Sequence, residues 1–182
     1  KNLKYKIQTS FLLLAFLCSF QLTAKKADVE KSRQVNKTFT VTPKQLIKLE
    51  NKFGEMNITS WDKNEVVVDI FIKVKRGNEK KTQEALDDIE IIISNTADEL
   101  SIETVFGKNN KEVKMNGDGE IQIDYNIKIP TGNKLEVVHA FGPFVIGQHK
   151  GATDIKVSFG GATIGSLLNE SNQLDFQFAN PV

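Results

Sequence analysis

The side chains that could carry out chemistry are few, and their spacing specifies no reaction. The chain has two histidines, His139 and His149, and one cysteine, Cys18. A typical zinc site takes four ligands, mostly Cys and His, so these residues are too few to form one. His149 lies in the turn Gln148-His149-Lys150, and we expect its side chain to be solvated.

Acidic residues gather in two short groups near the middle of the chain. Paired carboxylates can serve as the acid and base of a glycosidase. Acidic groups at the ends of helices and strands are more often solvated surface, and we favour that interpretation. The groups are Asp87-Asp88-Ile89-Glu90 and Asp98-Glu99.

The segment Asn116-Gly117-Asp118-Gly119-Glu120 is similar to the start of a calcium-binding loop. Such a loop needs an acidic residue two places earlier, where this chain has Lys114, so we interpret the segment as a turn. The sequence also contains no Gly-x-Ser-x-Gly nucleophile motif and no phosphate-binding loop. It predicts a protein that is not an enzyme, with no catalytic, cofactor-binding or metal-binding residues.

The strongest pattern is a repeated phrase near the end of the sequence. Phe141-Gly142-Pro143-Phe144-Val145-Ile146-Gly147 recurs 18 residues later as Phe159-Gly160-Gly161-Ala162-Thr163-Ile164-Gly165. A partial copy begins at Phe178-Ala179, and an earlier copy is Phe53-Gly54-Glu55-Met56-Asn57-Ile58. Each complete copy has Phe, then Gly, then Ile five places after the Phe.

Residues at equal distances from each Phe form columns. Steps of two match a strand, whose alternate side chains share a face, and the Gly marks a bend. One unit cannot bury its apolar face alone, so the spacing predicts stacked units with inward Phe rings. His139 is expected at the core or its edge. An antiparallel meander is the alternative. The columns are Leu49, Val137, Ile155 and Leu174; Asn51, His139, Val157 and Phe176; Met56, Phe144 and Ala162; and Ile58, Ile146 and Ile164.

These patterns predict an all-β fold, a β-solenoid or β-helix-like stack of strands, with one short helix near residues 78–88. Good helix formers follow Asn78, which is a fair N-cap. We expect a single domain over residues 37–182. Residues 37–130 would be an irregular β part with the helix, and residues 131–182 the stacked Phe-Gly repeats. Because the sequence stops partway through a unit, we expect a truncated stack whose open edge could self-associate.

The first 24 residues have the features of a signal peptide. Three lysines precede the apolar run Phe11–Phe20, and Ala24 offers a cleavage point. The run is short for a membrane span of ~20 apolar residues; an uncleaved anchor is the alternative. Cys18 follows Leu17 rather than a small residue, which disfavours lipidation. Residues 25–36 are polar without periodicity, and we expect a flexible tether.

Composition and charge exclude some partners. The chain is 40% hydrophobic and 26% charged, as is usual for a globular protein. The formal net charge is +1, and removing residues 1–24 leaves 21 basic and 23 acidic residues, a charge of −2. A near-neutral domain gives no reason to expect nucleic acid.

The segment Asn51–Ile58, followed by Trp61–Val66, resembles a family of exported bacterial proteins known as adhesins or auto-transporter adhesin head-like domains. The resemblance continues through the helical stretch and Tyr125–Pro130 into the Phe-Gly units. It implies an exported, repeat-built β-helix domain and brings no catalytic residues. Family members have an acidic residue after the aromatic-Gly pair, which only Glu55 keeps here.

We therefore expect an exported, non-enzymatic module in the periplasm, at the outer-membrane surface or outside the cell. It would act by adhesin-like surface contact with a glycan or protein, with no membrane span in the mature chain. The outward residues Lys156, Ser158 and Gln177 are the predicted contact surface. An envelope sensor or regulatory module that binds another protein through its open C-terminal edge is the alternative, and a carbohydrate-active β-helix enzyme is the third hypothesis.

Overall fold

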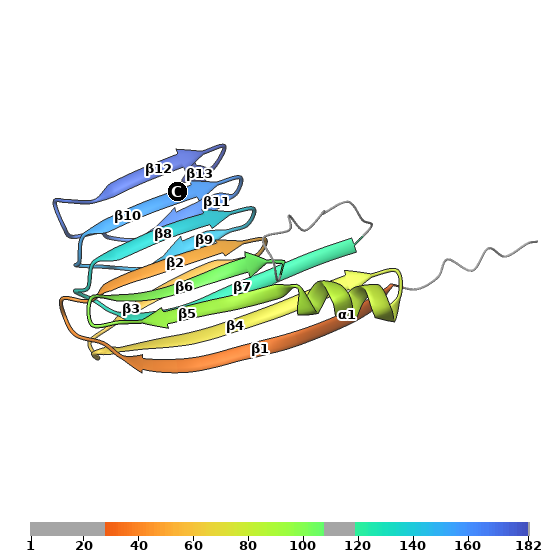
Figure 1. The fold of residues 1–182 in the computed structure, drawn as a ribbon. Coiled ribbons are helices and arrows are strands. Elements are labelled where there is room, and N and C mark those ends of the chain that lie inside the picture. Colours follow the sequence, from red (N-terminus) through yellow and green to blue (C-terminus); the bar gives the residue numbers. More distant parts are fainter. Residues whose placement is uncertain (1–27, 108–118, 182) are drawn as a thin grey trace, which may run out of the picture.

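The computed structural model describes residues 28–107 and 119–181, which form two sheets with a core between them (Figure 1). The predicted signal peptide over residues 1–24 and most of the candidate calcium loop lie outside the described residues. The chain is mostly β with one short helix, and both sheets are mixed and open. The mostly-β prediction is thus confirmed, whereas the β-solenoid stays a prediction.

The first sheet combines antiparallel and parallel pairing. Its strands, in spatial order, are β1 (Val29–Thr40), β4 (Glu65–Arg76), β7 (Gly119–Pro130), β3 (Met56–Trp61), β9 (Phe144–Ile146), β11 (Gly161–Ile164) and β13 (Asn180–Pro181). The pairs β1–β4 and β4–β7 are antiparallel. All pairs from β7 onward are parallel.

The second sheet is parallel except at one edge. Its strands, in spatial order, are β12 (Gln173–Gln177), β10 (Thr153–Ser158), β8 (Leu135–Ala140), β2 (Leu46–Lys52), β6 (Glu99–Phe106) and β5 (Ile89–Asn95). Only β5 and β6 pair antiparallel.

At each Phe-Gly corner the chain crosses from the second sheet to the first. We call the two strands joined by one corner a rung; β2–β3, β8–β9, β10–β11 and β12–β13 are the rungs found from the repeat. Neighbouring rungs are in register: Val137 pairs with Leu49 and Ile155, and Phe144 pairs with Met56 and Ala162. The predicted columns are therefore confirmed.

Strands β6 and β7 form a fifth rung, which the sequence pattern did not predict. Strand β6 is parallel to β2 with Ile102 beside Leu49, and the same register places Phe106 beside Phe53. Strand β7 is correspondingly parallel to β3. The phrase Phe106-Gly107 was the available signal, but the alternating pattern resumes only in β7, so the spacing of the other copies is lost.

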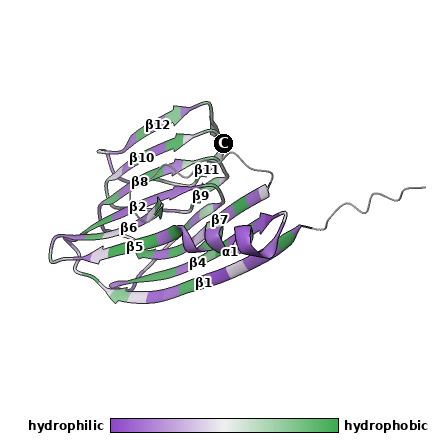
Figure 2. Ribbon diagram, turned by 45° about the vertical axis from the view of Figure 1, so that its right-hand side comes forward, coloured by the Kyte–Doolittle hydropathy of each residue, from purple (hydrophilic) through white to green (hydrophobic). Residues whose placement is uncertain are grey.

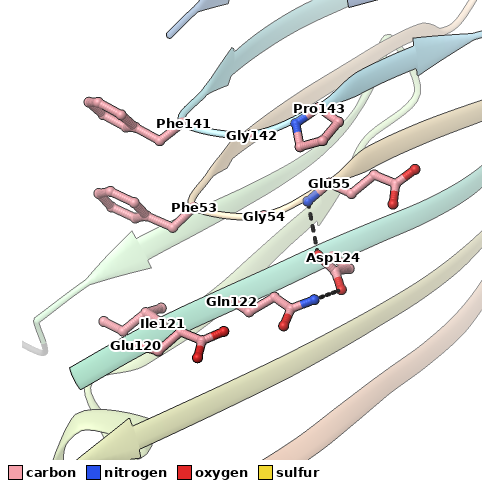
Figure 3. Close-up of a pocket in the computed structure, with 10 residues that line it drawn as sticks. All are labelled: Phe53, Gly54, Glu55, Glu120, Ile121, Gln122, Asp124, Phe141, Gly142 and Pro143. Carbon is pink, nitrogen blue, oxygen red and sulfur yellow. Dashed lines mark hydrogen bonds between the residues drawn. The ribbon is translucent and has the colours of Figure 1, made fainter. Parts of the chain in front are cut away.

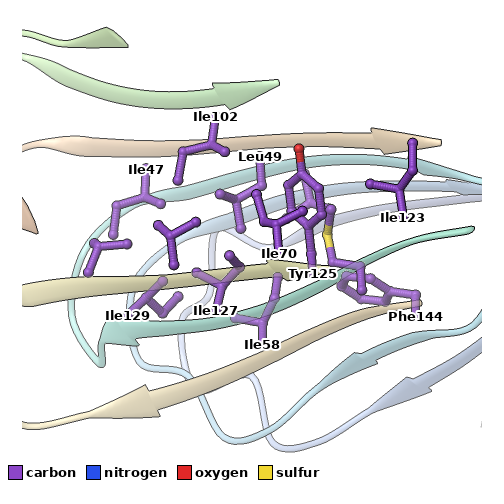
Figure 4. Close-up of a cluster of buried hydrophobic side chains, with 14 of the residues drawn as sticks. Ile47, Leu49, Ile58, Ile70, Ile102, Ile123, Tyr125, Ile127, Ile129 and Phe144 are labelled. Carbon is purple, nitrogen blue, oxygen red and sulfur yellow. The ribbon is translucent and has the colours of Figure 1, made fainter. Parts of the chain in front are cut away.

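The core lies between the sheets and consists mainly of Ile, Val and Leu (Figure 4). Alternate residues of β4 and β7 supply much of it, as a strand with one buried face should. Among these is Tyr125, whose ring is fully buried. Because the columns are in register, the inward side chains of each rung pack beside those of the next rung within this core.

The predicted helix is present as α1 (Glu79–Asp87). The Asn78 side chain caps it by accepting a hydrogen bond of 2.9 Å from the Lys81 amide. Its surface is largely hydrophilic (Figure 2), and Leu86 is buried against the core. The helix contacts β1, β4 and β5 and so covers the end of the molecule remote from β12.

The tether prediction for residues 25–36 is wrong where the structure describes them, because Val29–Asn36 belong to β1. Strand β1 pairs with β4 along its whole length. Polar residues are tolerated here because β1 is an edge strand. Lys31 bonds to Gln83 at 2.9 Å and Glu79 at 3.1 Å, and Arg33 donates to the Ile89 carbonyl. The ladder of backbone hydrogen bonds, rather than apolar alternation, orders this segment.

Candidate binding surface

Four phenylalanines at the corners adopt a left-handed backbone conformation. Their φ angles lie between 52° and 67°, a region that costs a non-glycine residue about 1–2 kcal/mol. The strain is repeated at every corner of the repeat, which points to a shared structural cause. These residues, which we call the Phe ladder, are Phe53, Phe141, Phe159 and Phe178.

The glycine after Phe53, Phe141 and Phe159 allows the rungs to approach closely, whereas Phe178 is followed by Ala179. A Cβ atom on Gly142 would overlap the carbonyl oxygen of Gly54, and one on Gly160 would overlap that of Gly142. Gly161, by contrast, has open space where its Cβ would be. Packing therefore requires Gly142 and Gly160, whereas it does not require Gly161, the second glycine of the Phe159 corner.

The rings of the Phe ladder stack on the outside of the molecule. Consecutive ring centroids are 5.0–5.1 Å apart, with interplanar angles of 3–9°. Phe141 and Phe159 lie one above the other, as the repeat predicts. Their side chains do not point inward, however: Phe141 is 47% exposed and Phe159 is 49% exposed. The expectation of buried Phe rings is wrong, because positive φ turns the side chain away from the face that the preceding alternate residues occupy.

A groove of about 370 Å³ lies beside the lower part of the ladder (Figure 3). We call it the corner groove. Two Phe-Gly corners form one side, and the start of β7 forms the other. It is lined by Phe53, Gly54, Glu55, Glu120, Ile121, Gln122, Asp124, Phe141, Gly142 and Pro143.

The Asp124 carboxylate accepts two hydrogen bonds that fix the geometry of the corner groove. Asp124 Oδ1 accepts from the Glu55 amide at 2.9 Å, and Oδ2 accepts from Gln122 Nε2 at 2.6 Å. Glu120 lies 3.6 Å from the Lys73 ammonium group. Asp124 therefore ties β7 to the Phe53 corner.

His149 is buried, contrary to the prediction that it is solvated. Its Nε2 donates to the Asn133 carbonyl at 2.8 Å, so Nδ1 accepts from the Ser60 hydroxyl at 2.9 Å. The sequence showed only a turn, but these turns also stack, and His149 forms a parallel bridge with Leu167. Burial lowers the pKa of His149.

His139 is buried in its column, as predicted. Its Nε2 donates to the Gly142 carbonyl at 3.2 Å, whereas Nδ1 has no hydrogen-bond partner among the described residues. Burial lowers the pKa of His139 as well. A neutral imidazole in this position is a structural group beside the Phe141 corner.

A chain of buried hydrogen bonds connects the two sheets in the neighbouring rungs. The Tyr125 hydroxyl donates to Thr104 at 2.8 Å, Thr104 donates to Asn51 Oδ1 at 3.0 Å, and Asn51 Nδ2 donates to the Ile123 carbonyl at 2.7 Å. Burial raises the pKa of Tyr125 far above its usual value. Each polar atom here has a partner, which is typical of structural networks.

The other sequence candidates do not converge on one place. Asp87, Asp88 and Glu90 are exposed around the end of α1, and Asp98 lies in the turn before β6. Over residues 28–107 and 119–181, no three His, Cys, Asp or Glu side chains are grouped so that they could hold a metal ion. In the same residues, no helix has the length and apolar character needed to cross a membrane.

Comparison with known proteins finds similar solved structures at low identity. A "putative cell adhesion protein" of Clostridium sporogenes is 14% identical, with a TM-score of 0.41, over 75% of this chain and 61% of that one. A "putative adhesin" of Parabacteroides merdae is also 14% identical, with a TM-score of 0.28, over 72% and 56%. A "putative lipid binding protein" of Parabacteroides distasonis is 13% identical, with a TM-score of 0.30, over 80% and 60%.

The chain thus spans about three fifths of the length of these structures. No protein-family model and no curated protein matches it. Likeness at this level assigns no role to any residue of this chain.

Proposed function

We propose that this chain is an exported, non-enzymatic module that acts by surface contact, with its rungs forming a short β-solenoid-like stack. The exposed Phe ladder is the observation that carries this proposal. Exposed apolar side chains arranged contiguously on a protein mark interaction sites more often than scattered ones do. The signal-peptide features of residues 1–24 support export.

The surface beside the ladder suits contact rather than reaction. Next to Phe141 and Phe159 in the sequence, several residues are small or uncharged, namely Ala140, Pro143 and Gly161. The predicted contact residues Lys156, Ser158 and Gln177 all point outward from β10 and β12. A partner therefore meets an apolar strip that runs across the rungs, with polar sheet surface beside it.

Binding of the purified chain to a glycan array and to isolated outer-membrane and matrix fractions tests this function. We expect saturable binding to at least one of these materials. Phe159→Ser should weaken it, whereas Lys80→Ser, exposed on α1 at the other end of the molecule, should leave it unchanged. Absence of saturable binding, or equal binding by Phe159→Ser, would contradict the proposal.

A second candidate is binding of another protein, or of a second copy, through the β12 edge. Among the described residues, β12 pairs only with β10. At this end Phe178 is 84% exposed, and Leu168 and Leu174 are also exposed. Light scattering of the wild type and of Leu174→Lys tests this candidate. A monomeric wild type would exclude binding of a second copy. If a pull-down with Leu174→Lys retains the same proteins as the wild type, binding of another protein through this edge is excluded.

A further inference from the structure

Strand β7 extends beyond the corner of the rung beside it. Its pairing with β3 begins at Tyr125, whereas β7 itself begins at Gly119. The amides of Ile123 and Tyr125 face the β3 side, since they donate to the Phe53 carbonyl at 2.6 Å and the Glu55 carbonyl at 2.8 Å. By the alternation of a strand, the N–H and C=O of Ile121 face the same side.

In the part of the chain that the structure describes, this stretch of β7 is an unpaired strand edge along the corner groove. Strand β4 pairs with the other edge of β7 from Gly119 onward. Within the described residues, no strand pairs with residues 119–122 on the side that faces the groove. An extended segment could therefore add to the sheet here through backbone hydrogen bonds, as in β-strand addition.

The groove offers different chemistry on the two sides of such a segment. On the side of Ile121 lie apolar groups of the two corners, including Phe53 and Gly54. On the outer side lie the carboxylates of Glu55, Glu120 and Asp124. Lys73 pairs with Glu120, and Lys75, across from Glu120 on β4, pairs with Asp28. Among the described residues, Glu55 and Asp124 have no basic side chain as a partner, and they are the carboxylates available to a cation. Successive side chains of an added strand would meet these two environments alternately.

We propose that the corner groove binds an extended peptide segment of a partner protein in which basic residues alternate with apolar ones. The segment pairs with the Ile121 backbone, places its basic side chains beside the three carboxylates and its apolar side chains against the corner. A glycan is a poorer fit, because the two rings that line the groove already pack against other rings: Phe141 stacks on Phe53 and Phe159, and Phe53 also meets Phe106 edge-on. The inference rests on the proposed function and names its class of partner.

Fluorescence anisotropy with a labelled peptide of alternating Lys and Val, titrated with the 182-residue chain, tests this site. Ile121→Pro removes the groove-facing donor without removing a hydrogen bond to β4, and it should weaken binding about fivefold. Glu120→Lys should also weaken it about fivefold at low salt and less at high salt. The control Glu90→Lys, exposed on β5, should bind like the wild type, and circular dichroism checks that each variant is folded.

Two control peptides separate the parts of the proposal. A Glu-Val peptide should bind far more weakly than the Lys-Val peptide, and so should a Lys-Val peptide methylated on alternate amides. Equal binding of the acidic peptide, or unchanged affinity in both groove variants, would overturn the site. So would failure of every peptide to bind while a glycan binds in the groove and is lost in Glu120→Lys.

The outcome can be told apart from that of the surface-contact test. If binding to envelope material is lost in Phe159→Ser but kept in Glu120→Lys and Ile121→Pro, the peptide site is wrong and the surface function stands. If the Lys-Val peptide binds as described but no natural material does, the groove stands and the surface function fails.

Discussion

At the scale of single residues, the ladder phenylalanines combine a strained backbone with an exposed ring. Each ring in the interior of the ladder stacks on two others, and each aromatic pair contributes about 0.5–1.5 kcal/mol. Two such contacts are of the same size as the cost of the left-handed conformation. Stacking therefore offsets strain at each corner and leaves the ring rims available to a partner.

Replacing Phe159 should destabilise the protein less than replacing the buried Phe144 of the adjacent rung. We expect Phe159→Ala to lose about 1–3 kcal/mol through its two stacking contacts. Phe144→Ala should lose about 3–5 kcal/mol, since its ring is fully buried. Urea unfolding monitored by circular dichroism measures both. Equal losses would mean that the ladder is part of the core in solution.

The two buried histidines predict a loss of stability in weak acid. Their pKa values are lowered in the folded state, chiefly by burial, and a histidine of the unfolded chain titrates near pH ~6.5. Above that pH both states hold neutral histidine. As the pH falls below it, the unfolded chain takes up protons first, so stability declines until the folded-state pKa is reached.

Unfolding midpoints in urea between neutral and mildly acidic pH check this expectation. His149→Gln and His139→Val should each flatten the decline, and His139→Val also removes the unpaired Nδ1 atom. If the urea midpoint of the wild type does not change with pH over this range, the two imidazoles do not control the stability of the protein in weak acid.

At the scale of elements, the corner is the unit that positions both the ladder and the groove. At Phe53, Phe141 and Phe159 it consists of a Phe in the left-handed conformation, a glycine against a carbonyl of the neighbouring rung, and the return strand. Because the glycine contact joins neighbouring rungs, a change in one corner acts on two rungs at once.

A methyl group at the first corner glycine should disrupt packing, whereas one at the second should not. Gly160→Ala places Cβ against the Gly142 carbonyl and should cost about 1–3 kcal/mol or more. Gly161→Ala, one residue along, meets open space and should stay within about 0.5 kcal/mol of the wild type. Thermal unfolding of the matched pair distinguishes them. Similar melting temperatures of the two variants would argue against the close approach of Gly160 to the Gly142 carbonyl.

At the scale of the whole molecule, the stack has unlike ends. Helix α1 and the long strand β1 cover one end, while β12 and β13 form the other. In structures built from stacked units, stability is a sum over neighbouring contacts. Among the described residues, the rung β12–β13 has one neighbour, whereas β2–β3 has two.

Hydrogen exchange should therefore form a gradient along the stack. Amides in β12 should exchange faster than those in β2, with β10 between them. Mass spectrometry of exchanged peptides measures this directly. Equal protection in β12 and β2 would indicate that another chain covers the β12 edge, as in the second candidate function.

The sequence predicted what its periodicity encodes. The columns through Leu49 and Met56 followed from equal spacing, and α1 followed from its composition and cap. The outward direction of Phe159 could not be predicted, because strict alternation places it inward and only the backbone angle reverses it. The first part of β1, Val29–Asn36, was missed because its order comes from pairing with a partner distant in sequence. The corner groove was hidden because β7 reaches it from another part of the chain.

The order of the rungs differs from their order along the chain, and this affects how the protein folds. Of the rungs, β2–β3 is synthesised first, yet its neighbours β6, β7, β8 and β9 come much later. Ile47, for example, pairs with Leu135. Such long sequence separations slow folding, so the nascent chain cannot complete its centre until most of its length is available. A polypeptide with that property stays unfolded for longer, which is compatible with the export proposed above.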